Sequence, residues 1–207
     1  MGTSHAAPDV SKHTRNRTRG AETLLFARNF FRHPRMLGSI IPSSRFLVRQ
    51  LLAHIDWDNA RVIVEYGPGS GVITKEILRR MRPDAHLVVI ETNPEFVRFL
   101  SESLPDPRLR VVEDSAVAVD EILRGHGLDK ADYIISGIPF STLDAPLREQ
   151  ILRKTSAVLQ PGGAFLVFQF STRVLPDLRR VFHYVKRSFQ PLNVLPAHLF
   201  ICEPGRA

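Results

Sequence analysis

The sequence is poor in residues that mark several classes of protein. Cys202 is the only cysteine among 207 residues, which excludes an internal disulfide framework and a multi-cysteine zinc site. No apolar run approaches the roughly 18 residues that a membrane-spanning helix needs. The first 35 residues lack the apolar centre of a signal peptide. We therefore expect a single globular domain from a reduced, cytosolic compartment.

Acidic residues are scarce near the N-terminus. The formal net charge is +7, and residues 1–35 contribute +5 of it. A basic segment of this kind is typical of contact with a polyanion, either a nucleic acid or an anionic lipid surface. The alternative is a solvated tail that has no partner.

An amphipathic helix is predicted within this basic segment, at residues 21–33. Its apolar arc includes Phe30 and Phe31, and Arg28 and Arg32 lie on the opposite side. Such a helix can lie in the interface of a membrane, or it can pack on the domain that follows. We divide the chain into this arm, at residues 1–35, and one domain at residues 36–207.

The domain alternates strand and helix patterns, which predicts an α/β, doubly wound sheet of seven mostly parallel strands with an antiparallel last strand. Strands are expected at 61–66, 86–91, 109–113, 131–136, 164–170, 182–190 and 198–203. Helices are expected at 45–55, 71–82, 94–103, 116–125, 144–158 and 174–181. The turn residues Pro161-Gly162-Gly163 are expected to separate the fifth strand from the helix before it. The last two strands should form an antiparallel hairpin at one edge.

A glycine-rich turn follows the first strand. Gly67, Gly69 and Gly71 occupy alternate positions, and Glu65 stands two residues before them. This spacing differs from the G-x-G-x-x-G of dinucleotide-binding turns, and a carboxylate at the turn suits a positively charged ligand. An ordinary turn between a strand and a helix is the alternative.

Polar residues recur at the carboxyl ends of the next three strands, which meet at one rim of a parallel sheet. Glu91-Thr92 follow the second strand, and Glu91 is suited to accept the hydroxyls of a ribose. Asp114-Ser115 follow the third strand, and a Ser136-Gly137-Ile138-Pro139-Phe140 loop follows the fourth. Helix-capping roles for Glu91 and Asp114 are the alternative.

Together these motifs, over residues 61–170, resemble the class I S-adenosylmethionine (SAM) methyltransferases, which have a Rossmann-like fold. The resemblance implies a SAM-dependent enzyme in which Asp114 accepts the adenine amino group. It also implies a cofactor-binding set of Ser39, Glu65, Gly67, Gly69, Gly71, Glu91, Thr92, Asp114, Ser115 and Ser136.

Over residues 21–203 the chain resembles the branch that contains ribosomal RNA adenine dimethyltransferases and bacterial phospholipid N-methyltransferases. Gly137 occupies the place where the RNA enzymes carry an asparagine, and Gly38 to Ser44 looks like the Gly-x-x-x-Pro-Ser-Ser segment of the lipid enzymes. The resemblance to the lipid enzymes implies methylation of phosphatidylethanolamine towards phosphatidylcholine. It also implies a cytoplasmic protein held peripherally at an anionic inner membrane by residues 21–34, without a nucleic-acid partner.

Methylation of an alkyl amine requires removal of a proton, because the ordinary pKa of such an amine is about 10.4. Tyr66 is a candidate proton acceptor, and so is His198 if the last strand faces the rim, although a structural role in its strand is the favoured alternative for His198. Aromatic rings hold a methylated ammonium well, and the candidates are Tyr66, Phe140 and Phe200. We expect Phe168 and Phe170 to lie in the core.

Three other functions stay open on the sequence. The chain could methylate RNA adenine at N6, with the basic arm on the phosphates, or it could methylate a small molecule. It could also bind SAM or lipid as a sensor without catalysis.

Overall fold

The computed structural model describes residues 44–192 and 196–205. The basic arm, the helix predicted at 21–33 and Ser39 lie outside the described residues. None of the helices in the described part of the chain has the length and apolar character that crossing a bilayer requires.

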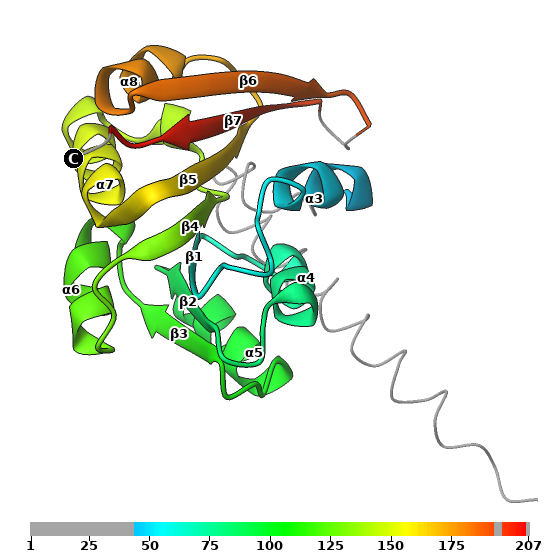
Figure 1. Ribbon diagram of the computed structural model, residues 1–207. Helices are drawn as coiled ribbons and strands as arrows, with labels where there is room; N and C mark the ends of the chain where they lie inside the picture. The colour runs from blue at the N-terminus through cyan, green and yellow to red at the C-terminus, as the bar shows by residue number, and fades with distance from the viewer. Residues whose placement is uncertain (1–43, 193–195, 206–207) are drawn as a thin grey trace, which may run out of the picture.

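A seven-stranded sheet in the order β3-β2-β1-β4-β5-β7-β6 forms the centre of the domain (Figure 1). Strands β1 to β5 are parallel, and β7 runs antiparallel to both β5 and β6. The predicted fold class and the hairpin at one edge are thereby confirmed. The strands are β1 (Val62–Tyr66), β2 (His86–Glu91), β3 (Leu109–Glu113), β4 (Ala131–Ser136), β5 (Leu159–Gln169), β6 (Tyr184–Gln190) and β7 (Ala197–Glu203).

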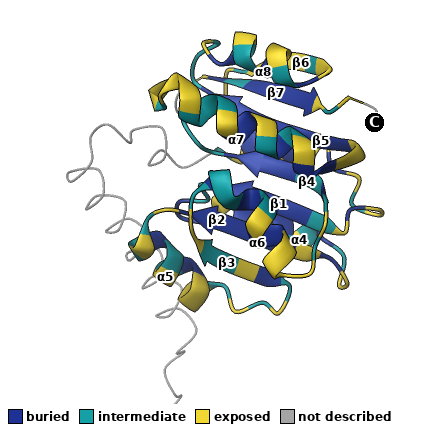
Figure 2. Ribbon diagram, turned by 90° about the vertical axis from the view of Figure 1, so that its left-hand side faces the viewer, coloured by how far each residue is buried: buried dark blue, intermediate teal, exposed yellow. Residues whose placement is uncertain are grey.

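Helices cover both faces of the sheet (Figure 2). One face packs on α3 (Arg45–Leu52), α4 (Val72–Arg80) and α5 (Pro94–Ser103). The other packs on α6 (Val119–Gly125), α7 (Ala145–Val158) and α8 (Leu175–Val181). Two short 3-10 turns, η2 (Ala116–Ala118) and η3 (Phe140–Thr142), complete the described elements. Because both faces are covered, the central strands are buried along almost their whole length, as their continuous apolar sequences require.

The fifth strand starts earlier than predicted. Residues Pro161 to Gly163 lie within β5, where the pairing with β4 shifts register, and do not form a separate turn. A Cβ at Gly163 would lie 2.5 Å from the backbone oxygen of Asp132. A close approach of two backbones therefore explains why residue 163 is a glycine. A sequence pattern does not distinguish such an approach from a turn.

Arg108, which precedes β3, fixes the carboxyl end of α4. Its guanidinium is paired with Asp106 at 2.7 Å. It also donates hydrogen bonds to three backbone oxygens at the end of that helix, those of Leu78, Met81 and Arg82. The last carbonyls of a helix have no partner within the helix, so one side chain here supplies what the helix lacks.

Replacing Arg108 by alanine should lower the free energy of unfolding by about 2 kcal/mol, because it removes several charge-assisted hydrogen bonds. Urea denaturation measures this loss. Arg110→Ala is the matched control, since Arg110 bonds only to nearby carbonyls at an exposed position, and it should change stability by less than about 0.5 kcal/mol. Equal losses in the two variants would contradict the capping role.

Candidate active site

The glycine-rich turn links the end of β1 to the start of α4. Gly67, Gly69 and Gly71 have φ angles of 63°, 56° and 75°, a region that favours glycine. A Cβ at Gly71 would also lie 2.5 Å from a methyl carbon of Leu100. The alternate glycines are therefore required by the path of the backbone, and they leave main-chain groups at the rim without covering side chains.

Glu65 is a buried carboxyl group directly below this turn. Its side chain accepts a hydrogen bond from the Thr74 hydroxyl at 2.6 Å. Burial raises the pKa of Glu65 to about 8, and the nearby Glu91 adds to the shift. At neutral pH the group therefore holds a proton in the free protein, and a cation placed beside it would favour the ionised form.

Glu91 lies at the end of β2, beside the same turn. It accepts hydrogen bonds from the backbone N–H of Gly69 at 3.4 Å and of Asn93 at 2.9 Å. Burial raises its pKa as well. Two neighbouring buried carboxyl groups, in the described part of the chain neither paired with a basic side chain, match a ligand that carries positive charge and hydroxyl groups.

A cavity of about 310 Å³ opens at this rim, on the side covered by α6 and α7. Gly67, Glu91, Thr92 and Ser115 line it, so strands β1, β2 and β3 each contribute. The remaining lining residues are Ala116, Ile138, Pro139, Thr142, Leu143, Leu147 and Ile151. We call it the cofactor cleft. Its apolar wall and polar rim suit a nucleoside.

Five described residues of the predicted set do not line the cleft: Glu65, Gly69, Gly71, Asp114 and Ser136. Asp114 is exposed, and its carboxylate accepts a hydrogen bond from the backbone N–H of Ser115 at 2.6 Å. Ser136 is buried, and its hydroxyl accepts from the backbone N–H of Ile138 at 3.2 Å. Ser136 thereby shapes the loop after β4.

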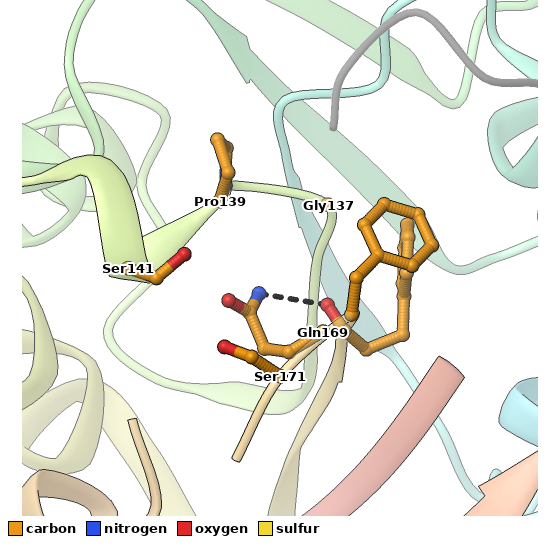
Figure 3. A pocket seen from close by; sticks show the side chains of 7 residues that line it. Gly137, Pro139, Ser141, Gln169 and Ser171 are labelled. Carbon is orange, nitrogen blue, oxygen red and sulfur yellow. Dashed lines mark hydrogen bonds between the residues drawn. The ribbon is translucent and has the colours of Figure 1, made fainter. Parts of the chain in front are cut away.

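A second, smaller cavity of about 130 Å³ lies on the other side of that loop (Figure 3). Pro139 lines both this pocket and the cofactor cleft. The other lining residues are Gly137, Ser141, Phe168, Gln169, Phe170 and Ser171. We call it the acceptor pocket, because its position next to the cleft allows two ligands to meet at the loop.

Phe168 and Phe170 contact the core, as expected, and they also supply the aromatic wall of the acceptor pocket. Their rings lie 6.5 Å apart and nearly perpendicular. Phe168 is 7% exposed and also contacts the core, whereas Phe170 is half-buried. The spacing of two phenylalanines at the end of β5, on one face of the strand, is the sequence signal that could have identified them.

Gln169 is a second residue that the sequence reading missed. Its amide nitrogen donates to the backbone oxygens of Ile138 and Phe168, each at 2.7 Å, and its amide oxygen accepts from the backbone N–H of Phe140 at 3.1 Å. Figure 3 shows this amide between the loop and the end of β5. A single buried side chain therefore holds the loop that separates the two cavities.

The structure assigns Tyr66, Phe140 and Phe200 to the core, which corrects their predicted roles. All three side chains are fully buried on the face covered by α6, α7 and α8. The Tyr66 hydroxyl is hydrogen-bonded to Thr155 at 3.2 Å, and burial raises its pKa above the ordinary value. In this packing Tyr66 cannot take a proton from a ligand in either cavity, and none of these rings can hold a methylated ammonium.

His198 lies near the rim but lines neither cavity. Its ring packs between Phe189, at 5.1 Å, and Phe200, at 6.4 Å. Among the described residues its Nδ1 atom is buried without a hydrogen-bond partner. Burial, assisted by Arg187, lowers the pKa of His198, so the imidazole is neutral at pH 7. This arrangement agrees with the alternative of a structural residue.

Comparison with known proteins decides the chemistry. The sequence model of the methyltransferase small domain matches residues 38–191, which include the glycine turn, the cleft and the acceptor pocket. The chain belongs to this methyltransferase family. The methyl donor of this family is SAM, and the cofactor cleft is the candidate site for it.

Two relatives illustrate the range of similarity. The ornithine lipid N-methyltransferase of Singulisphaera acidiphila is 36% identical over 180 residues, covering 86% of this chain and 94% of that protein. Ribosomal RNA small subunit methyltransferase A of Laribacter hongkongensis is 33% identical over 102 residues, covering 49% of this chain and 37% of that protein.

Solved structures agree on the fold. Precorrin-6y C5,15-methyltransferase from Geobacter metallireducens superposes with a TM-score of 0.64 at 15% identity, covering 80% of this chain and 91% of that one. PigF, solved with S-adenosylhomocysteine, gives a TM-score of 0.59 at 16% identity, with 77% and 55% coverage. At these identities the likeness concerns the fold alone.

The protein contributes to methyl transfer by positioning the two reactants and by placing charged groups beside the methyl donor. SAM brings a methyl group activated by a positive sulfur, and Glu65 and Glu91 would hold its charged and hydroxyl groups at the rim. Pro139, which lines both cavities, would orient the acceptor amine against the methyl group where the cavities adjoin, so that an oriented approach replaces a bimolecular search. No side chain needs to form a covalent bond.

SAM binding should release a proton near pH 7, because the bound ammonium ionises Glu65, whose pKa in the free protein is about 8. Calorimetry in two buffers of different ionisation enthalpy measures this release. Glu65→Gln should abolish most of it, and Glu102→Gln, on the exposed side of α5, should not. Equal proton release by wild type and Glu65→Gln would rule out this assignment.

The raised pKa of Glu65 also determines whether the free energy of unfolding rises or falls with pH. Below pH 4.5 the carboxyl is protonated in both the folded and the unfolded protein, and stability is lost as pH rises towards about 8. The slope of the free energy of unfolding between these values should be smaller in Glu65→Gln.

Gln169→Leu should reduce the methylation rate by about tenfold or more while SAM affinity changes less than about threefold, because the loop moves but the cleft persists. Gln160→Leu, at an exposed position of the same strand, is the control. Gln169→Glu tests the donor separately, since a carboxylate cannot donate to the two backbone oxygens. A parallel loss of SAM binding would contradict a role confined to the loop.

Proposed function

We propose that the chain transfers methyl groups from SAM to the primary amine of a membrane lipid. The similarity to ornithine lipid N-methyltransferase carries this proposal, because it extends over 94% of that protein and is not confined to the SAM-binding half of the fold. The RNA methyltransferase match, in contrast, covers 37% of its relative.

The acceptor pocket supports an alkyl amine. It offers the rings of Phe168 and Phe170 together with the hydroxyl groups of Ser141 and Ser171 (Figure 3). Hydroxyl oxygens accept hydrogen bonds from an amine, and aromatic faces stabilise a cation by about 0.5–2 kcal/mol. The pocket therefore suits both a primary amine and the more methylated products that have fewer N–H groups.

Gly137 argues against a nucleobase in this pocket. A Cβ at Gly137 would lie 2.9 Å from the backbone oxygen of Gly67 and 3.5 Å from the Phe168 ring. A side chain that binds a base amine from this position would displace the cofactor turn, because the approach to the Gly67 oxygen is too close. The loop is instead built for close contact between two backbones.

Deprotonation of the lipid amine follows from the environment. An alkyl ammonium enters a pocket with an apolar wall and without a carboxylate among its lining residues. Such surroundings disfavour the charged form and lower the pKa of the amine from about 10.4. The neutral amine is the form that attacks, and the proton leaves to solvent before methyl transfer.

Two lipids carry the required amine: phosphatidylethanolamine, which the sequence motifs suggest, and ornithine lipid, which the relative methylates according to its name. Both belong to a membrane, so the reaction is placed at a membrane surface, with the basic N-terminal segment at residues 21–34 as a further contact. Phosphatidylethanolamine would be carried towards phosphatidylcholine by repeated transfer.

Purified protein incubated with methyl-labelled SAM and vesicles containing one lipid at a time should label one of these two lipids. Chromatography of the extracted lipids identifies which amine is methylated and how many times. Parallel reactions with ribosomal RNA and with soluble primary amines are the controls. Label in RNA, or in soluble amines with none in either lipid, would refute the proposal.

A further inference from the structure

Exposed apolar side chains lie on both faces of one corner of the domain, where the end of β6 meets the start of α3. Gln50 of α3 bonds to Ser188 and Gln190, whereas Phe189 faces the opposite side of β6 and packs on His198. Phe46, Phe189 and Leu192 are 42%, 52% and 60% exposed. The Ser44 hydroxyl donates to the backbone oxygen of Leu192 at 2.8 Å, which joins the two segments. Figure 1 shows α3 beside the tip of the β6–β7 hairpin. We call these three side chains the rim patch.

Positive charge without negative charge surrounds the rim patch. Residues 44–55 and 182–202 contain no aspartate or glutamate. Arg45, Arg49 and Arg187 are exposed, and within 44–192 and 196–205 they form no ion pair with a carboxylate. The Arg45 guanidinium lies over the Phe46 ring at 5.0 Å. Arginines that flank exposed aromatic rings are characteristic of contact with anionic lipid.

The rim patch lies on the same rim as the catalytic cavities. Because β6 and β5 both run antiparallel to β7, their carboxyl ends point the same way. Phe189 pairs with His198, and His198 pairs with Gln169, so the three residues form one row across three strands. This row leads from the exposed Phe189 to the side chain that lines the acceptor pocket.

We propose that the rim patch docks onto an anionic bilayer and so presents the acceptor pocket to lipid amines, an inference that rests on the proposed function. Charge complementarity selects the occupant, because the apolar side chains are flanked by arginines alone. Residues 1–43 join the described chain at Ser44, next to the patch. The basic, phenylalanine-rich segment predicted to bind a membrane is therefore attached at the same corner.

The full-length triple variant Phe46→Ser, Phe189→Ser, Leu192→Ser should bind vesicles of phosphatidylglycerol and phosphatidylcholine about tenfold more weakly than wild type in co-sedimentation. Arg45→Gln with Arg49→Gln should weaken binding to these vesicles severalfold, with little change on pure phosphatidylcholine. Tyr184→Ser, at the opposite end of β6 and 49% exposed, is the apolar control. Arg179→Gln, exposed on α8, is the charge control.

Measurements of methylation activity distinguish a failure of the docking surface from a failure of the proposed function. The triple variant should methylate lipid in vesicles more slowly, yet equal wild type on a short-chain lipid dispersed below its micelle concentration, with SAM binding unchanged. If wild type methylates no lipid but needs the patch to bind vesicles, the proposed function fails and the docking surface stands.

Unchanged vesicle binding by the triple variant would overturn the docking surface, even if lipid is methylated. So would a wild-type dimer that the same substitutions dissociate, because the patch would then join two copies. Greater protease sensitivity of residues 1–43 in the triple variant, with vesicle binding retained, would assign the patch to the chain's own N-terminal segment and overturn the proposal as well.

Discussion

The burial of two carboxyl groups beside a bare glycine turn is the constraint on which the site depends. Glu65 and Glu91 lie on strands that are covered by helices on both faces, so both carboxyl groups are buried. Desolvation disfavours their ionised forms, and a bound cation would favour them. The turn can approach a ligand closely because its three glycines carry no side chains. The positive charge of a bound methyl donor would therefore offset the negative charge of the buried carboxylates.

The acceptor side is organised by hydrogen bonds and not by charge. The Gln169 amide bonds to the backbone of Ile138 and Phe140 in the loop after β4 and to the backbone of Phe168 in β5, which fixes the loop. This loop lies between the two cavities. Aromatic rings and hydroxyl groups then define what can approach from the far side. Separation of donor electrostatics from acceptor shape is consistent with similar chains that are named for methylating a lipid or a ribosomal RNA.

Sequence patterns predicted the strands and the order in which they are connected, since these follow from the hydrophobic period. Four residues of the predicted cofactor set, Gly67, Glu91, Thr92 and Ser115, line the cofactor cleft. The patterns failed where the role of a residue depends on the direction in which its side chain points. Tyr66 and Phe140 stand next to the right motifs, yet the packing of α7 turns both rings into the core. Phe168 and Phe170 contact the core as predicted, but the sequence pattern does not show that they also line the acceptor pocket at the end of β5. Residues 1–43 carry predictions that the described residues do not address.

The contact between the Gly137 and Gly67 backbones has a consequence for how such enzymes diverge. The two glycines belong to different loops, and a Cβ at Gly137 would lie 2.9 Å from the Gly67 backbone oxygen, so the glycine turn would have to move. At Gly67 the positive φ of 63°, and not a clash with Gly137, disfavours a side chain. An asparagine at position 137 would therefore displace the glycine turn of the candidate cofactor site. Exchange between lipid-modifying and base-modifying specificity at this position involves the donor side of the site as well as the acceptor side.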